Sequence, residues 1–74
     1  MRILIEPDPA TDPNAGNEVR RALHVLHAAY ILTDGGGTLQ SGDRVTGVIM
    51  LRSDPDAARA LEVLARAGIK ASIA

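Results

Sequence analysis

The chain has 74 residues, with no cysteine, tryptophan or phenylalanine and a single tyrosine. A domain of this size buries only roughly 60% of its unfolded-chain surface, so its core must be almost wholly aliphatic, and we expect association with a partner to add stability. Eight basic residues nearly balance nine acidic ones, and the basic residues are dispersed. Without a basic stripe or stacking aromatics, direct nucleic-acid binding is disfavoured.

The composition also bears on compartment and domain organisation. With no cysteine there is no disulfide framework and no thiol nucleophile, so we expect a cytoplasmic protein. No stretch approaches the ~20 apolar residues of a membrane span, and Met1–Pro7 is too short an apolar run for a signal peptide. We expect one small domain over residues 1–74, without membrane contact.

The first predicted element is a strand over residues 2–6, which stops at Pro7. Both neighbours of Leu4 are apolar, so we expect this strand to be covered on both faces and to lie inside a sheet. Three prolines lie between residues 7 and 13. They fix φ and remove backbone donors, which predicts a stiff, extended, acidic connection without regular structure.

The next predicted element is a helix that begins at Asn14 or Asn17, either of which can cap it, and extends to Leu32. Its core-facing stripe recurs at helical spacing and comprises Val19, Ala22, Leu23, Leu26 and Tyr30. Arg21, Val25 and Leu32 fall on the side away from that stripe. Since Val25 and Leu32 are apolar for an outward face, we predict a contact patch there.

The glycine run 35–37 is predicted to end this helix, because glycine accepts the left-handed backbone angles of a helix C-terminus. A weak strand over 38–40, a turn over 41–43 and a strand over 45–52 predict a hairpin of one edge strand and one interior strand. Residues 48–51 are continuously apolar, which again indicates a strand covered on both faces.

Asp54 and Pro55 predict the start of a second helix, with Asp54 as its cap and Pro55 in the first helical position. The buried stripe of this helix comprises Ala57, Ala60, Leu61, Leu64 and Ala67. Gly68 ends the helix. Residues 69–73 then alternate between apolar and polar, which predicts a half-buried edge strand with Lys70 discouraging further pairing.

The predicted order β-α-β-β-α-β indicates an α+β fold, a ferredoxin-like sandwich in which a four-stranded antiparallel sheet carries both helices on one face. The first and third strands, which look doubly buried, take the interior positions. A competing arrangement omits the strand over 38–40 and leaves a parallel three-stranded unit. It needs a structureless connection of about a dozen residues between Leu32 and Arg44, which is long for a compact domain.

A metal site is the first chemical possibility to weigh. His24 and His27 stand three residues apart on one predicted helix face, a spacing that two metal ligands can use. Asp8, Asp12 or Asp34 would have to complete the ligand set, and the sequence positions none of them. Surface or interface histidines are the favoured interpretation, and we expect no metal and no cofactor.

No catalytic constellation stands out in the sequence. Ser41, Ser53 and Ser72 lack the G-x-S-x-G elbow of a serine nucleophile. The glycine run 35–37 follows a predicted helix instead of leading into one, which disfavours phosphate binding. We therefore expect no catalytic residues and no enzyme activity.

Two stretches of sequence are similar to motifs of a known family. Residues 12–16, DPNAG, are similar to an acidic-x-Pro-Gly turn, with two residues between proline and glycine here, and residues 60–69, ALEVLARAGI, form a leucine-rich helix stopped by Gly-Ile. Together they resemble the ACT domain, a small regulatory βαββαβ module that often binds amino acids at subunit interfaces. The resemblance implies a small ligand of the amino-acid type held by Asp12, Asn14 and Gly16.

The hypothesis that the sequence supports is a non-catalytic binding or regulatory module that acts through protein–protein association. It would form a homodimer through a sheet edge or through the helix face with Arg21, Val25 and Leu32. The alternative is a stand-alone inhibitor or adaptor of the phage-antagonist type. Its acidic segment over residues 6–12, including Asp8, would dock on a basic groove of a larger complex.

Overall fold

The elements follow the predicted order in a computed structural model that describes residues 1–8 and 10–74. The strands are β1 (Arg2–Ile5), β2 (Thr33–Ser41), β3 (Arg44–Leu51) and β4 (Ala71–Ile73). The helices are α1 (Gly16–Ala28) and α2 (Ala57–Arg66), and a short 3-10 turn, η1 (Asp54–Asp56), leads into α2.

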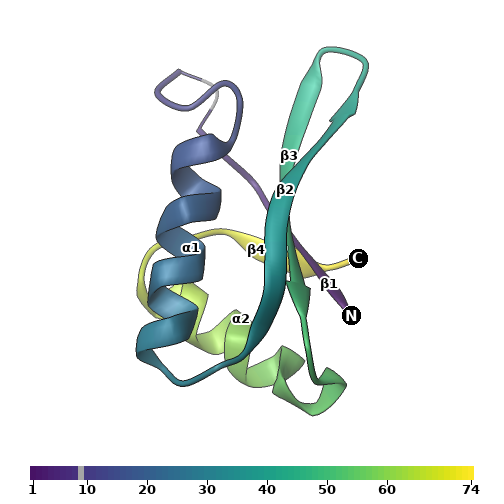
Figure 1. The fold of residues 1–74 in the computed structure, drawn as a ribbon. Coiled ribbons are helices and arrows are strands. Elements are labelled where there is room, and N and C mark those ends of the chain that lie inside the picture. Colours follow the sequence, from purple (N-terminus) through teal and green to yellow (C-terminus); the bar gives the residue numbers. More distant parts are fainter. Residues whose placement is uncertain (9) are drawn as a thin grey trace.

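The four strands form one antiparallel sheet in the order β2-β3-β1-β4. In the interior, Ile3 of β1 lies opposite Ile49 of β3 on one side and Ile73 of β4 on the other. The prediction that the first and third strands are interior is therefore confirmed, and the parallel three-stranded alternative is wrong. Figure 1 shows both helices on the same side of this sheet.

The core lies between the sheet and the two helices. Ile3, Ile5 and Ile49 from the sheet meet Leu26 of α1 and Leu64 of α2, and all five side chains are fully buried. Each such side chain contributes roughly 1.5–3 kcal/mol when it leaves water. The expectation of an almost wholly aliphatic core is confirmed, because the only buried polar residue among those described is Asp12.

Close packing of α1 on the sheet depends on two glycines. A Cβ atom placed on Gly47 of β3 would lie 2.5 Å from Cγ2 of Val19, and one on Gly36 of β2 would lie 3.1 Å from Cγ1 of the same side chain. Any larger residue there would push the helix outward. Glycine at both positions therefore lets Val19 sit directly on the backbone of two strands.

The sheet face away from the helices, here called the outer face, has no element of residues 1–8 and 10–74 lying over it (Figure 1). Leu4, Leu39, Val48 and Met50 lie on it and form what we call the outer-face patch. Met50 is 39% exposed and Leu39 is 49% exposed, whereas Leu4 is half-buried. The prediction that both apolar strands are covered on both faces is wrong, because two helices on one side leave the other side open.

The helix α1 begins at Gly16, between the two predicted starts, but ends at Ala28, four residues before the predicted end at Leu32. Neither Asn14 nor Asn17 caps it with a side chain. Instead the carboxylate of Asp12 accepts hydrogen bonds from the backbone N–H groups of Asn17 (3.3 Å) and Glu18 (2.8 Å). At the other end Tyr30 adopts a left-handed φ of 61°. This turns its side chain outward, so Tyr30 is 89% exposed and not the core residue that the spacing predicts.

The glycine run 35–37 does not end the helix, and that prediction is wrong. The run lies inside β2, which begins at Thr33 because the chain has already left the helix at Tyr30. A bulge separates Thr33 from Gly36 in the pairing with β3, and Gly35 takes up the irregularity with φ 114°. The predicted hairpin itself is confirmed, with β2 at an edge and β3 inside.

The predicted cap of the second helix is also wrong. No side-chain cap bond forms at the start of η1 or of α2. The carboxylate of Asp54 lies instead 3.4 Å from the N-terminal ammonium group of Met1. Pro55 occupies the first turn of η1, where a missing N–H costs nothing.

Both helices end with the same hydrogen-bond pattern. In α2 the N–H of Ile69 donates to the carbonyl of Leu64 (2.9 Å), and Gly68 adopts a left-handed φ of 76°, which confirms the predicted helix end. In α1 the corresponding bond is again 2.9 Å, and Tyr30 stands where α2 has Gly68. The same helix end therefore forms in α2 with glycine, which favours the left-handed conformation, and in α1 with tyrosine, which does not.

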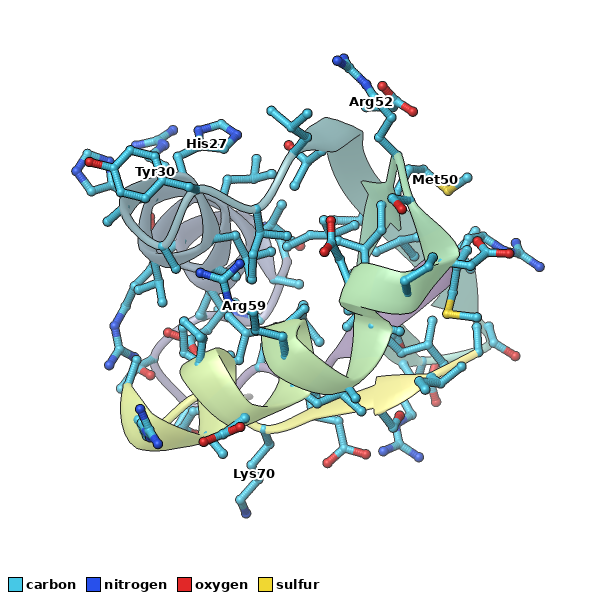
Figure 2. The ribbon with its side chains drawn as sticks, turned by 90° about the horizontal axis from the view of Figure 1, so that it is seen from below. His27, Tyr30, Met50, Arg52, Arg59 and Lys70 are labelled. Atoms are coloured by element: carbon cyan, nitrogen blue, oxygen red, sulfur yellow. The ribbon has the colours of Figure 1, made fainter. Side chains whose placement is uncertain are left out.

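The likeness of the two helices extends along their sequences. Residues 21–31 (RALHVLHAAYI) and 59–69 (RALEVLARAGI) are identical at seven of eleven positions. The equivalent arginines make reciprocal contacts: Arg59 donates to the carbonyl of Ala29 at 2.6 Å, and Arg21 donates to the carbonyl of Ala67. Figure 2 shows Arg59 between the two helices. Each guanidinium therefore lies at the negative end of the other helix.

Candidate functional site

The residues predicted to hold a small ligand lie at the start of α1. Asp12 is only 8% exposed, and both of its carboxylate oxygens accept backbone hydrogen bonds from the first turn of the helix. Asn14 and Gly16 are exposed beside it. A ligand that used the Asp12 carboxylate would have to displace the helix N-terminus, so the geometry gives this carboxylate a capping role.

The residues predicted to form a helix-face interface do not share one face. Val25 is half-buried and packs against the core, whereas Leu32 is 56% exposed and lies beyond the end of α1. Arg21 spans Glu18, at 3.3 Å, and the carbonyl of Ala67. The premise of a continuous helix surface through Leu32 is wrong, because the helix ends at Ala28.

Asp8 and the histidines are surface residues. Asp8 accepts a hydrogen bond from the backbone N–H of Ala10 at 3.0 Å, within the proline segment. His24 and His27 are both exposed, and Nε2 of His27 lies 3.0 Å from Oγ1 of Thr33. Within residues 1–8 and 10–74, no three His, Cys, Asp or Glu side chains gather into a group that could hold a metal ion.

Two hollows lie near the proline segment. The larger, about 540 Å³, opens between that segment and the end of the β2–β3 hairpin, and Arg44 spans it to reach Glu6 at 3.6 Å. The smaller, about 380 Å³, is acidic because Glu6, Asp8 and Glu18 line it together with Lys70. Ser41 lines the larger hollow, and neither histidine does.

The outer-face patch adjoins the β2 edge of the sheet, and no element of residues 1–8 and 10–74 lies over it (Figure 1). Leu4 lies opposite Val48, and Val48 lies opposite Gly37 of β2. Val48 and Met50 border a shallow hollow of about 380 Å³ over residues 34–39. Figure 2 shows Met50 pointing away from both helices.

The sequence interpretation missed this surface because it took the apolar runs as evidence of cover on both faces. The available signal was the element count, because two helices that lie on one face of a four-stranded sheet leave its other face uncovered. The runs themselves carried no such signal, because residues 3–5 are all apolar although Ile3 and Ile5 are fully buried and Leu4 between them is half-buried.

Neither helix in the described part of the chain has the length and apolar character needed to cross a bilayer. Comparison with protein-family models, with curated proteins and with solved structures finds no match to this chain.

Proposed function

We propose that this chain is a non-catalytic binding module that acts through protein–protein association, using the outer face of its sheet. The observation that carries the proposal is the outer-face patch, in which Leu39 and Met50 are 49% and 39% exposed on either side of Val48, which is 8% exposed. Apolar side chains grouped on one uncovered sheet face are typical of interaction sites, whereas single exposed ones are ordinary.

We place the module in the ferredoxin-like class. Two features support this assignment: the element order β-α-β-β-α-β and the strand order β2-β3-β1-β4. In a two-layer fold of this kind the helices protect one sheet face and leave the other available to a partner. The fold assignment therefore agrees with an outer-face function without establishing it.

The test is association that depends on Met50. The purified chain is measured by sedimentation velocity over a concentration series and is also immobilised to capture proteins from cell lysate. Met50→Glu places a carboxylate on the outer face, and Ala58→Glu adds the same charge on the exposed side of α2. We expect association that Met50→Glu abolishes and Ala58→Glu leaves intact. A chain that associates with nothing, or two variants that behave alike, would refute the proposal.

One observation favours a second function, docking on a basic partner. The acidic hollow brings Glu6, Asp8 and Glu18 together on one side of the molecule. A basic groove would be attracted to it, and the contact would weaken with salt. The double variant Glu6→Gln with Asp8→Asn tests this docking without touching Asp12, whose carboxylate caps α1. Capture that is insensitive to the double variant but lost in Met50→Glu would exclude it.

A further inference from the structure

The two edges of the sheet differ in how they are protected against another strand. The β4 edge has three residues and Lys70 beside it. The β2 edge has nine residues, of which eight are exposed, and pairs with no strand of residues 1–8 and 10–74 on its outer side. Its one charged residue, Asp34, is held by Nε of Arg52 at 2.9 Å. Lysine and proline, the usual guards of an edge strand, are missing from β2.

One glycine of β2 has no role inside the chain. Gly35 takes a positive φ, and Gly36 makes room for Val19. Neither requirement for glycine applies at Gly37, because a Cβ atom there would meet nothing within 4 Å and the φ of Gly37 is not positive. A glycine in a strand costs stability and often marks a close approach from outside. On the outer face of the sheet, Gly37 lines the shallow hollow beside Val48.

The pairing of β2 with β3 determines which backbone groups point to the outer edge. Ser41 lies opposite Arg44 across a two-residue turn. A turn of this length is closed by a hydrogen-bonded pair, and bonded and unbonded pairs alternate along the ladder. The N–H and C=O groups of Gly36, Thr38 and Gln40 therefore point away from β3, where a new strand would meet them.

We propose that β2 pairs antiparallel with β2 of a second copy of this chain, about a two-fold axis at Thr38. The proposal rests on the association function above and adds a self-pairing site at the β2 edge, which adjoins the outer-face patch. In this register Thr38 faces its own equivalent and Gly36 faces Gln40 of the second copy, so all the outward backbone groups of residues 36–40 are bonded. Leu39 of each copy lies opposite Gly37 of the other, where its side chain covers the hollow beside Val48. The two sheets become one continuous sheet of eight strands.

A single cysteine tests the register. The chain has no cysteine of its own, so Thr38→Cys introduces one thiol at the axis. Directly bonded residues in an antiparallel pair have Cα atoms about 5.5 Å apart, within the range that a disulfide bridges. Oxidised glutathione is expected to link Thr38→Cys chains as dimers and to leave Ser72→Cys chains, with the thiol at the opposite edge, as monomers. Equal yields would overturn the register.

Charge complementation provides a second test. Thr38 is exposed and not part of the core, so Thr38→Lys and Thr38→Glu leave the buried side chains of one copy in place, but like charges then face each other across the axis. Each variant alone is expected to dissociate at a concentration at least about tenfold higher than the original chain. An equimolar mixture should restore the dimer, whereas Ser72→Lys and Ser72→Glu should dimerise like the original chain.

The outcomes separate the self-pairing from the general function. A chain that stays monomeric to millimolar concentration and gives no Thr38→Cys crosslink overturns the self-pairing, even if Met50-dependent capture of another protein upholds the association function. A dimer that is indifferent to Thr38→Lys also overturns it. A dimer that responds to the Thr38 variants supports it.

Discussion

Replacing Tyr30 with glycine should stabilise this protein. Tyr30 holds a left-handed φ of 61°, and in α2 the equivalent position is Gly68, with φ 76°. An L-residue pays for that conformation through contact between its Cβ atom and the following carbonyl, whereas glycine does not. The Tyr30 side chain is 89% exposed, so its removal forfeits almost no burial.

The size of the effect follows from two opposing terms. Relief of the left-handed conformation contributes about 1–2 kcal/mol. The greater conformational freedom of glycine in the unfolded chain reduces this gain in stability by about 0.5–1 kcal/mol. The central values of the two terms leave a net gain for Tyr30→Gly of about 0.75 kcal/mol, which in a domain of this length raises Tm by about 3–6 °C.

The matched control is Gly68→Ala at the end of α2. A Cβ atom there would lie 3.9 Å from Nη2 of Arg21, an ordinary contact, so the expected loss of about 1 kcal/mol is conformational. Thermal unfolding followed by circular dichroism, at one matched protein concentration, measures both variants. If Tyr30→Gly left Tm unchanged or lowered it while Gly68→Ala behaved as expected, the reasoning about strain at Tyr30 would be refuted.

Three further substitutions test the packing by urea unfolding. Asp12→Ala should cost about 1–2 kcal/mol because two backbone N–H groups lose their acceptor; a neutral result would show that the cap is dispensable. Gly47→Ala should cost about 1–3 kcal/mol because its Cβ would lie 2.5 Å from Val19, and adding Val19→Ala should recover part of that loss; strictly additive losses would contradict the close contact. Arg59→Ala should cost about 0.3–1 kcal/mol through the bond to Ala29, and an unchanged midpoint would argue that this exposed contact contributes nothing.

The sheet was predictable because its signals are local and agree with one another. Apolar β-rich runs marked β1 and β3, and the order of elements put both in the interior. The end of α1 was not predictable in the same way. It is made by Tyr30, whose residue type disfavours the angle it adopts, so the end is enforced by the burial of Ile31 at 1% exposure. Because the helix has already ended before Thr33, the glycine run 35–37 forms part of β2.

The candidate site was harder to predict than the fold, because its signals depend on contacts between distant residues. The resemblance of residues 12–16 to a ligand-binding turn assigned Asp12 to a ligand, but the partners of its carboxylate are backbone amides five and six residues along the chain. The outer face could be recognised only by combining the predicted position of both helices with the element count, and not from any single run of residues. The repeated helix, by contrast, is visible in the sequence itself, because residues 21–31 and 59–69 align without a gap and place the two arginines at equivalent positions.

The reciprocal arginine contacts indicate that the two halves of the chain are related to each other. Exchanging β1 with β3, β2 with β4 and α1 with α2 leaves the strand order unchanged. Under that exchange Arg21 becomes Arg59, and the carbonyl of Ala67 becomes that of Ala29. Two identical βαβ polypeptides meeting about a two-fold axis would make the same contacts. The molecule thus has the architecture of a dimer joined into one chain, with the turn at residues 42–43 as the junction.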